Sequence, residues 1–199
     1  MASDLSITIT PADLTCHNVL AIAEVNATLN LSRVVRVFKN AEYDDSKFTS
    51  VRVRMWKYGC TVAIFSSGKL QVTGAAKPTD AHTALKVVAY RLKKFVDPSI
   101  QFSNVRFDNI LATFDIGSRM DLFGLSRDAA LTVTYMPSQF AAAVVRETSG
   151  TGVVIDVFGS GKMNIKGKEG LERVCQGVNL VMPKIVKHLC QQLEDYQDN

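Results

Sequence analysis

The sequence predicts an α+β protein of two repeats related by a pseudo-twofold axis, with one antiparallel sheet of about ten strands and its long helices on one face. The motif IFSSGK at residues 64–69 returns as VFGSGK at residues 157–162, a shift of 93 residues. Other motifs return at shifts of 91 and 92 residues, and a near-constant shift indicates an internal repeat. Each copy combines short alternating segments, typical of strands, with a longer helical pattern.

The first copy begins after residues 1–15, which we expect to form a loosely ordered tail. Alternation of apolar and polar residues predicts the strands, and helical spacing with caps at Asn30 or Ser32 predicts a short helix that ends near Asn40. The predicted elements are a strand over 18–25, the short helix, strands over 47–56, 61–65 and 69–73 with a tight turn at 66–68, and a long helix over 79–95.

The second copy repeats this order. A short helix begins at Asp121, and the long helix begins at Lys168, with Pro183 predicted to kink it or split it. The predicted strands cover residues 105–116, 139–146, 153–158 and 162–166. The organisation is thus a first repeat over 16–103, a second repeat over 104–193 and a tail over 194–199.

Composition places the chain among ordinary globular proteins. Of the 199 residues, 47% are hydrophobic and 21% are charged. No apolar run approaches ~18 residues and the N-terminus lacks a signal pattern, so we expect an intracellular protein without a membrane partner. The four cysteines have no metal-site spacing, which predicts reduced thiols and no metal.

The charge is distributed unevenly between the repeats. Residues 16–97 carry 13 Lys or Arg and six Asp or Glu, whereas residues 104–193 carry 10 and eight. A basic half suggests a polyanionic or acidic partner, although ordinary solvated surface charge would give the same count.

If both long helices cover one face of the sheet, the other face is open. Phenylalanines alternate there with cations and amides, which suits a nucleic-acid surface because cations meet phosphates, amides reach base edges and rings stack or wedge. A place in the core is the alternative for each ring. By strand parity the open face carries Asn18, Leu20, Phe48, Arg52, Arg54, Phe65, Lys69, Gln71 and Thr73, and then Asn109, Leu111, Phe140, Arg146, Phe158, Lys162, Asn164 and Lys166.

Catalysis is not indicated. Both Ser-Gly-Lys turns lack the first glycine of a phosphate-binding loop and the Ser or Thr that follows its lysine. They also lie in hairpins instead of at helix starts. The three histidines lie far apart in the chain, and no nucleophile motif occurs. We therefore expect neither an enzyme nor a cofactor.

The chain closely resembles the TATA-box-binding protein family. The resemblance rests on Asn-Ala-Glu-Tyr at 40–43, Lys-Phe at 47–48, Thr-Gly-Ala at 73–75 and the two Phe-x-Ser-Gly-Lys turns, and it extends over about residues 16–193. It implies a saddle whose concave sheet binds the minor groove of DNA and kinks it with apolar wedges, and the kink of about 80° is the value established for this family itself.

The resemblance also implies roles for single residues. Arg52 is added to the phosphate contacts because its charge lies on the open face. The implied wedges are Phe48, Phe65, Phe140 and Phe158; the base-edge contacts are Asn18, Asn109, Leu20, Leu111, Gln71, Thr73, Asn164 and Lys166; the phosphate contacts are Lys47, Arg52, Arg54, Lys69, Arg146 and Lys162.

Some positions depart from the family. Gln71 and Asn164 replace valines, and Lys166 replaces the threonine that matches Thr73, so we expect weaker TATA preference. The loop at residues 135–139 of the second repeat lacks the acidic residues that, in the family, help bind transcription factor IIB. The residues expected to contact protein partners are Tyr135, Met136 and Ser138 in that loop, and Lys86, Arg91, Lys93 and Lys94 on the outer face of the first long helix.

These observations predict a nuclear initiation factor that binds and bends double-stranded promoter DNA and nucleates assembly of the pre-initiation complex. Its expected partners are factors of the IIA and IIB type and polymerase-associated proteins. One alternative is a related factor that acts mainly through protein contacts; another is a sheet-based module for a small ligand, which the paired phenylalanines disfavour. A homodimer of the free protein, the polymerase served and the source organism stay open.

Overall fold

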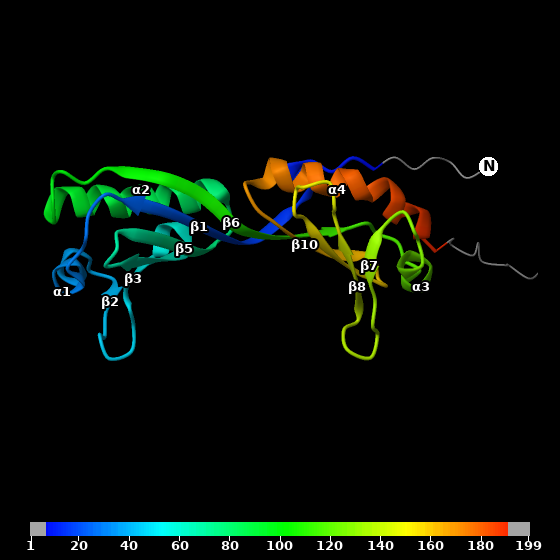
Figure 1. Cartoon of the computed structure of the whole chain (residues 1–199), viewed down its shortest axis with the longest axis horizontal. Helices are drawn as coiled ribbons and strands as arrows, with labels where there is room; N and C mark the ends of the chain where they lie inside the picture. Colours follow the sequence, from blue (N-terminus) through cyan, green and yellow to red (C-terminus); the bar gives the residue numbers. More distant parts are fainter. Residues whose placement is uncertain (1–6, 191–199) are drawn as a thin grey trace, which may run out of the picture. The chain divides into compact units, whose positions relative to one another are not determined.

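The computed structural model describes residues 7–190, and its sheet has ten strands in the order β2-β3-β4-β5-β1-β6-β10-β9-β8-β7 (Figure 1). The chain divides into two compact units, which are described separately. The first unit is residues 16–111 with 168–171, and the second unit is residues 112–167 with the described parts of 1–15 and 172–199. The predicted antiparallel sheet of about ten strands is confirmed.

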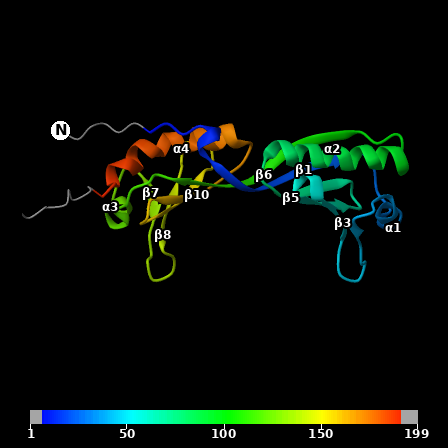
Figure 2. The same cartoon turned by 180° about the vertical axis from the view of Figure 1, so that it is seen from behind.

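The first unit follows the predicted order of elements. Its long helix α2 lies along one face of its strands, as Figures 1 and 2 show. The elements are β1 (Thr15–Val25), α1 (Leu31–Val34), a 3-10 turn (Val35–Val37), β2 (Ala41–Glu42), β3 (Ser50–Met55), a second 3-10 turn (Trp56–Tyr58), β4 (Cys60–Phe65), β5 (Lys69–Ala75), α2 (Pro78–Phe95) and β6 (Phe102–Asp115).

The core of the first unit lies between its strands and α2. Alternate strand residues are fully buried on that side, while their neighbours along the strand are partly exposed, as a half-buried sheet requires. Because only one face is covered, the strand pattern leaves the opposite face open. The buried side chains include Val51, Val53, Val62, Ile64, Leu70 and Val72 from the strands and Leu85, Val88 and Leu92 from α2.

The second unit repeats the arrangement with its own helix. A Cβ on Gly167 would collide with the side chain of Val174, which shows how closely α4 packs on β10. The elements are α3 (Leu122–Ser126), β7 (Thr132–Thr134), β8 (Ala142–Arg146), β9 (Val154–Phe158), β10 (Lys162–Gly167), α4 (Leu171–Ile185) and two 3-10 turns, Pro11–Asp13 and Val186–His188.

The repeated Ser-Gly-Lys turns join β4 to β5 and β9 to β10, as predicted. Gly68 and Gly161 have φ of 87° and 92°, a conformation that favours glycine. A Cβ on either residue would also collide with backbone carbonyl oxygens of its own unit, at Val25 and at Ser118. Glycine is therefore required at both turns for conformation and for space.

Two strand predictions began too early. Residues 44–48 and 136–140 form turns, in which the amides of Phe48 and Phe140 donate to the carbonyls of Asp44 and Met136, 2.8 and 3.0 Å away. Phe48 and Phe140 thus precede β3 and β8 and are not in them. The short edge strands β2 and β7 were not predicted, because segments of two and three residues carry no readable period.

Helix α4 differs from its prediction at its start and at Pro183. Glu169 and Gly170 have φ of 67° and 118°, which no α-helix accommodates, so the helix begins at Leu171 instead of Lys168. It continues through Pro183 to Ile185 and is therefore not split at the proline. The short helices begin as predicted, because the side chains of Asn30 and Asp121 accept from the amides of Arg33 and Gly124.

The residues before β1 are better fixed than the expected loose tail. Ile9 is buried, and its backbone forms two hydrogen bonds with the side chain of Asn179 in α4. The earlier part of that tail and the predicted tail over 194–199 lie outside the described residues. Within residues 7–190, no helix is long and apolar enough to cross a membrane.

Candidate nucleic-acid interface

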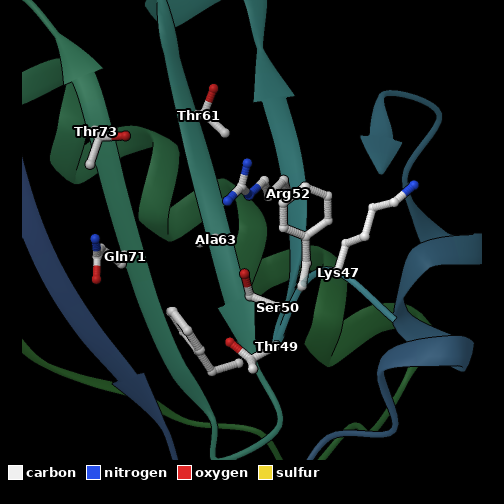
Figure 3. A pocket seen from close by; sticks show the side chains of 10 residues that line it. Lys47, Thr49, Ser50, Arg52, Thr61, Ala63, Gln71 and Thr73 are labelled. Carbon is white, nitrogen blue, oxygen red and sulfur yellow. The ribbon is translucent and has the colours of Figure 1, made fainter. Parts of the chain in front are cut away.

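The open face of the first unit is hollowed by a cavity of about 590 Å³. Its floor comes from β3, β4 and β5, and its outer wall from the loop before β3 (Figure 3). Six residues predicted from the sequence as DNA contacts lie together here, along with four that were not predicted. The lining residues are Lys47, Phe48, Thr49, Ser50, Arg52, Thr61, Ala63, Phe65, Gln71 and Thr73.

Strand register arranges this face in rows. Arg52 pairs with Ala63, and Ala63 pairs with Gln71 on the next strand. Side chains directly opposite each other in antiparallel strands point to the same side, so a cation and an amide flank a small residue in this row. The small side chain of Ala63 leaves the middle of the row low, which contributes to the hollow.

In the first unit, the rings of Phe48 and Phe65 both lie beneath cations. The guanidinium carbon of Arg52 is 4.0 Å from the ring centroid of Phe48, and the ammonium of Lys69 is 5.5 Å from that of Phe65. Such contacts hold a cation beside an apolar surface. The face therefore offers positive charge and stackable rings at the same places.

Lys47 lies in the loop before β3 and is 70% exposed. Its ammonium is 3.0 Å from the Asp44 carboxylate. Hydrogen bonding from the Ser46 hydroxyl, and then from Lys47, holds the pKa of Asp44 below its usual value. An exposed ion pair contributes little to stability, so Lys47 can exchange this partner for a phosphate at small cost.

Asn18 in β1 is held by the backbone. Its Oδ1 accepts from the amide of Gly74, 2.8 Å away, at a bulge where the β1–β5 register shifts. Gly74 has φ of 97°, which the bulge requires. With the oxygen occupied, the side-chain NH₂ of Asn18 remains available to donate to an acceptor, as its predicted role requires. Asn109 is exposed on β6.

The open face of the second unit has a different middle row. Asp156 pairs with Val144 and with Asn164, at the positions that Ala63, Arg52 and Gln71 occupy in the first unit. The Lys166 ammonium is 2.6 Å from the Asp156 carboxylate. The Lys166 side chain is 46% exposed and that of Asp156 only 3%. Lys166, expected as a free contact to DNA, is therefore already ion-paired.

The rings of the second unit contact each other instead of cations. Phe140 and Phe158 meet edge to face, with centroids 6.0 Å apart and an interplanar angle of 73°. Phe140 is nonetheless 45% exposed. Phe158 is half-buried, so neither ring is a fully buried core residue.

Other predicted residues lie outside the 590 Å³ hollow. The guanidinium carbon of Arg54 is 5.2 Å from the ring centroid of Trp56. Arg54 also lines a separate cavity of about 310 Å³ with Arg91 of α2. The structure therefore separates Arg54 from Arg52. The remaining predicted contacts are half-buried at Leu20, Lys69 and Leu111 and exposed at Arg146 and Lys162.

The predicted partner-binding residues are on the surface. Met136 and Ser138 are exposed, and Tyr135 contacts Phe123 edge to face at 5.4 Å. On α2, Lys86, Arg91, Lys93 and Lys94 are all exposed.

Sequence reasoning missed Asp156 and four residues that line the hollow, which are Thr49, Ser50, Thr61 and Ala63. Parity would have found Asp156, Thr61 and Ala63, because each lies two or four residues before a phenylalanine that was assigned to the open face. Among residues 7–190, no cluster of His, Cys, Asp and Glu could hold a metal ion.

Comparison with known proteins gives concordant matches. The family model described as transcription factor TFIID (or TATA-binding protein, TBP) matches residues 13–95 and 104–188. The chain is 32% identical to the TATA-box-binding protein of Pyrodictium occultum over 174 residues, which is 86% of this chain and 85% of that protein. It is 30% identical to TATA-box-binding protein-like 1 of Entamoeba histolytica over 175 residues, 88% of this chain and 78% of that protein.

The fold is likewise similar to a solved structure. Methanococcus jannaschii TBP superposes with a TM-score of 0.72 at 27% sequence identity, covering 88% of this chain and 99% of that one.

Proposed function

Since the chain belongs to the TATA-binding protein family, we propose that it binds promoter DNA through the open face of its sheet and bends the duplex from the minor groove. The family consists of DNA-binding transcription factors and not of enzymes, as expected from the sequence. Its partners in general are DNA and the transcription machinery. In a nucleated cell, such a factor would act in the nucleus.

The observation that carries the proposal is the pairing of partly exposed phenylalanines with cations on the side away from the helices. In the first unit, Arg52 and Lys69 lie over Phe48 and Phe65. A small-ligand site would instead enclose its ligand, whereas this hollow is open and lined by charged and polar groups. Rings at the surface can unstack a base step while neighbouring cations neutralise phosphates.

A binding and bending assay tests the proposal. A TATA duplex and a scrambled duplex, labelled at both ends for fluorescence energy transfer, should bind with a shortened end-to-end distance at a stated salt concentration. A homodimer of the free protein would cover the same rings, so sedimentation should first establish a monomeric concentration. No binding to either duplex at low salt would refute the proposal.

Protein contacts form the second part of the proposal. The exposed cations of α2 suit an acidic partner such as a factor of the IIA type, and the loop with Tyr135, Met136 and Ser138 would meet a factor of the IIB type. Reversing the charge of the four α2 cations should abolish recovery of the acidic partner and leave DNA affinity nearly unchanged. Unaltered recovery would leave these cations with a role in solubility alone.

A further inference from the structure

The ion pair between Asp156 and Lys166 lies on the face that the proposed function assigns to DNA. A carboxylate is unexpected there, because DNA is a polyanion. Asp156 is nevertheless almost fully buried in the middle row of the second unit. Burial of an ionised carboxylate requires a partner, and Lys166 supplies it at 2.6 Å.

Asp156 cannot itself hydrogen-bond to the minor-groove edge of an A·T pair. The minor-groove edge of A·T offers only acceptors, the adenine N3 and the thymine O2, and an ionised carboxylate is itself acceptor-only. The carboxylate is also covered, with 3% of its side chain exposed. Its influence on DNA must therefore pass through Lys166.

Lys166 has hydrogen-bond donors that Asp156 does not use. An ammonium carries three N–H groups, and the hydrogen bond to Asp156 uses one. The Lys166 side chain is 46% exposed, so its remaining N–H groups can reach a ligand on the open face. The ion pair therefore anchors the ammonium over β9 and leaves part of it open to a ligand.

We propose that Asp156 is a positioning residue that anchors the Lys166 ammonium as a fixed donor to acceptors on base edges, and so prevents it from neutralising a phosphate. This inference rests on the proposed function. A fixed donor is satisfied by A·T acceptors but faces the guanine amino group of G·C, which is also a donor. The pair therefore selects against G·C opposite the second unit.

The first unit provides the natural control. Ala63 and Thr73 occupy the positions of Asp156 and Lys166, with neither charge. Asp156→Ala therefore introduces a residue that the equivalent position already accepts. Because Lys166 is half exposed, the variant leaves a solvated cation and not a buried one.

The experiment compares wild type with Asp156→Ala and with the volume-matched Asp156→Asn, using TATA duplexes with and without one G·C substitution in either half. Release of Lys166 to a phosphate should steepen the slope of log affinity against log salt by ~0.9. Discrimination against G·C should fall by about five- to tenfold in one half-site only. Lys162→Ala, which removes a proposed phosphate contact, should make the slope shallower by ~0.9.

An unchanged salt slope together with unchanged discrimination in both Asp156 variants would overturn the inference, provided that wild type binds and bends the duplex. Loss of discrimination in both half-sites equally would also overturn it, because a general structural defect is not confined to one half. Failure of the wild-type protein to bind DNA would instead overturn the proposed function, so the two failures can be told apart.

Discussion

The open faces of the two repeats use the same rows for different chemistry. In the first unit, Arg52 and Gln71 flank a small alanine, and cations lie over both rings. In the second unit, Val144 and Asn164 flank a buried carboxylate, and the rings lie on each other. A repeated backbone thus fixes where side chains point, while the residues in each row decide which charges and rings the face presents.

The largest effect on stability should come from removing the cation of the second unit. Lys166→Thr copies Thr73 but leaves the buried Asp156 unpaired, which should lower the free energy of unfolding by about 2–3 kcal/mol in a urea titration. Lys162→Thr on the same strand is the control and should change it by less than ~0.5 kcal/mol. Adding Asp156→Ala to Lys166→Thr should recover most of the loss; without recovery, the carboxylate is not its cause.

Ring deletions should separate binding from folding. Phe65→Ala and Phe158→Ala should each weaken DNA binding by ~10- to 100-fold, since a stacked ring contributes ~1–3 kcal/mol. Phe158→Ala should also cost ~1 kcal/mol of stability through its lost contact with Phe140, and Phe65→Ala less. Thermal unfolding beside the bending assay measures both. A stability loss of ~3–5 kcal/mol would identify either ring as a core residue.

Gln71 and Asn164 should relax the preference at a central base pair, separately from the discrimination that the Asp156–Lys166 pair adds in the second half-site. Each can accept from the guanine amino group through its carbonyl and still donate through its NH₂. Wild type should therefore penalise a central G·C substitution by less than the ~1–3 kcal/mol typical of a mismatched pair. Gln71→Val with Asn164→Val should restore the penalty. A double variant that discriminates no better than wild type would show that these positions do not set specificity.

The most local effect should come from acid. Buried Glu147 organises the β8–β9 connection, where hydrogen bonds from Thr151 and Ser149 lower its pKa from 4.5 to about 2. A depressed folded-state pKa gives stability that is present above pH ~4.5 and is lost as the pH falls toward ~2. The corresponding connection of the first unit is the 3-10 turn Trp56–Tyr58, which has no such carboxylate.

Hydrogen exchange can locate this acid effect. Between about pH 4.5 and about pH 3, amide protection should fall more in β8 and β9 than in β3 and β4. Glu147→Gln should be less stable than wild type at about pH 7, and the difference should shrink as the pH falls. A constant difference over that range would mean that titration of Glu147 does not contribute.

The sequence predicted most of the fold, because alternation and the repeat both follow from a sheet with one buried face. It failed where a turn competes with a strand. Lys47 and Phe48 continue the alternating pattern of β3, yet the carbonyl and carboxylate of Asp44 bind the amides of the following residues and hold them in a turn. Periodicity cannot register a local hydrogen bond of this kind.

The site was predicted in part for a similar reason. Parity placed Gln71, Thr73 and Phe65 together, and the structure brings them to one hollow. Strand parity tells which face of the sheet a side chain is on, but not which side chain it contacts. It therefore could not reveal that Lys166 is bound to Asp156 or that Arg54 stacks on Trp56. Long cationic side chains have many rotamers, and the strand pattern does not select among them.

The Asp156–Lys166 pair also constrains the evolutionary route by which such a face can arise. A lysine at position 166 is tolerated alone, because half of its side chain reaches water. An aspartate at position 156 is not, because it would be buried without a cation. If the two repeats descend from one duplicated segment that carried neither charge, the lysine was acquired first and made the aspartate permissible, and reversion must follow the opposite order.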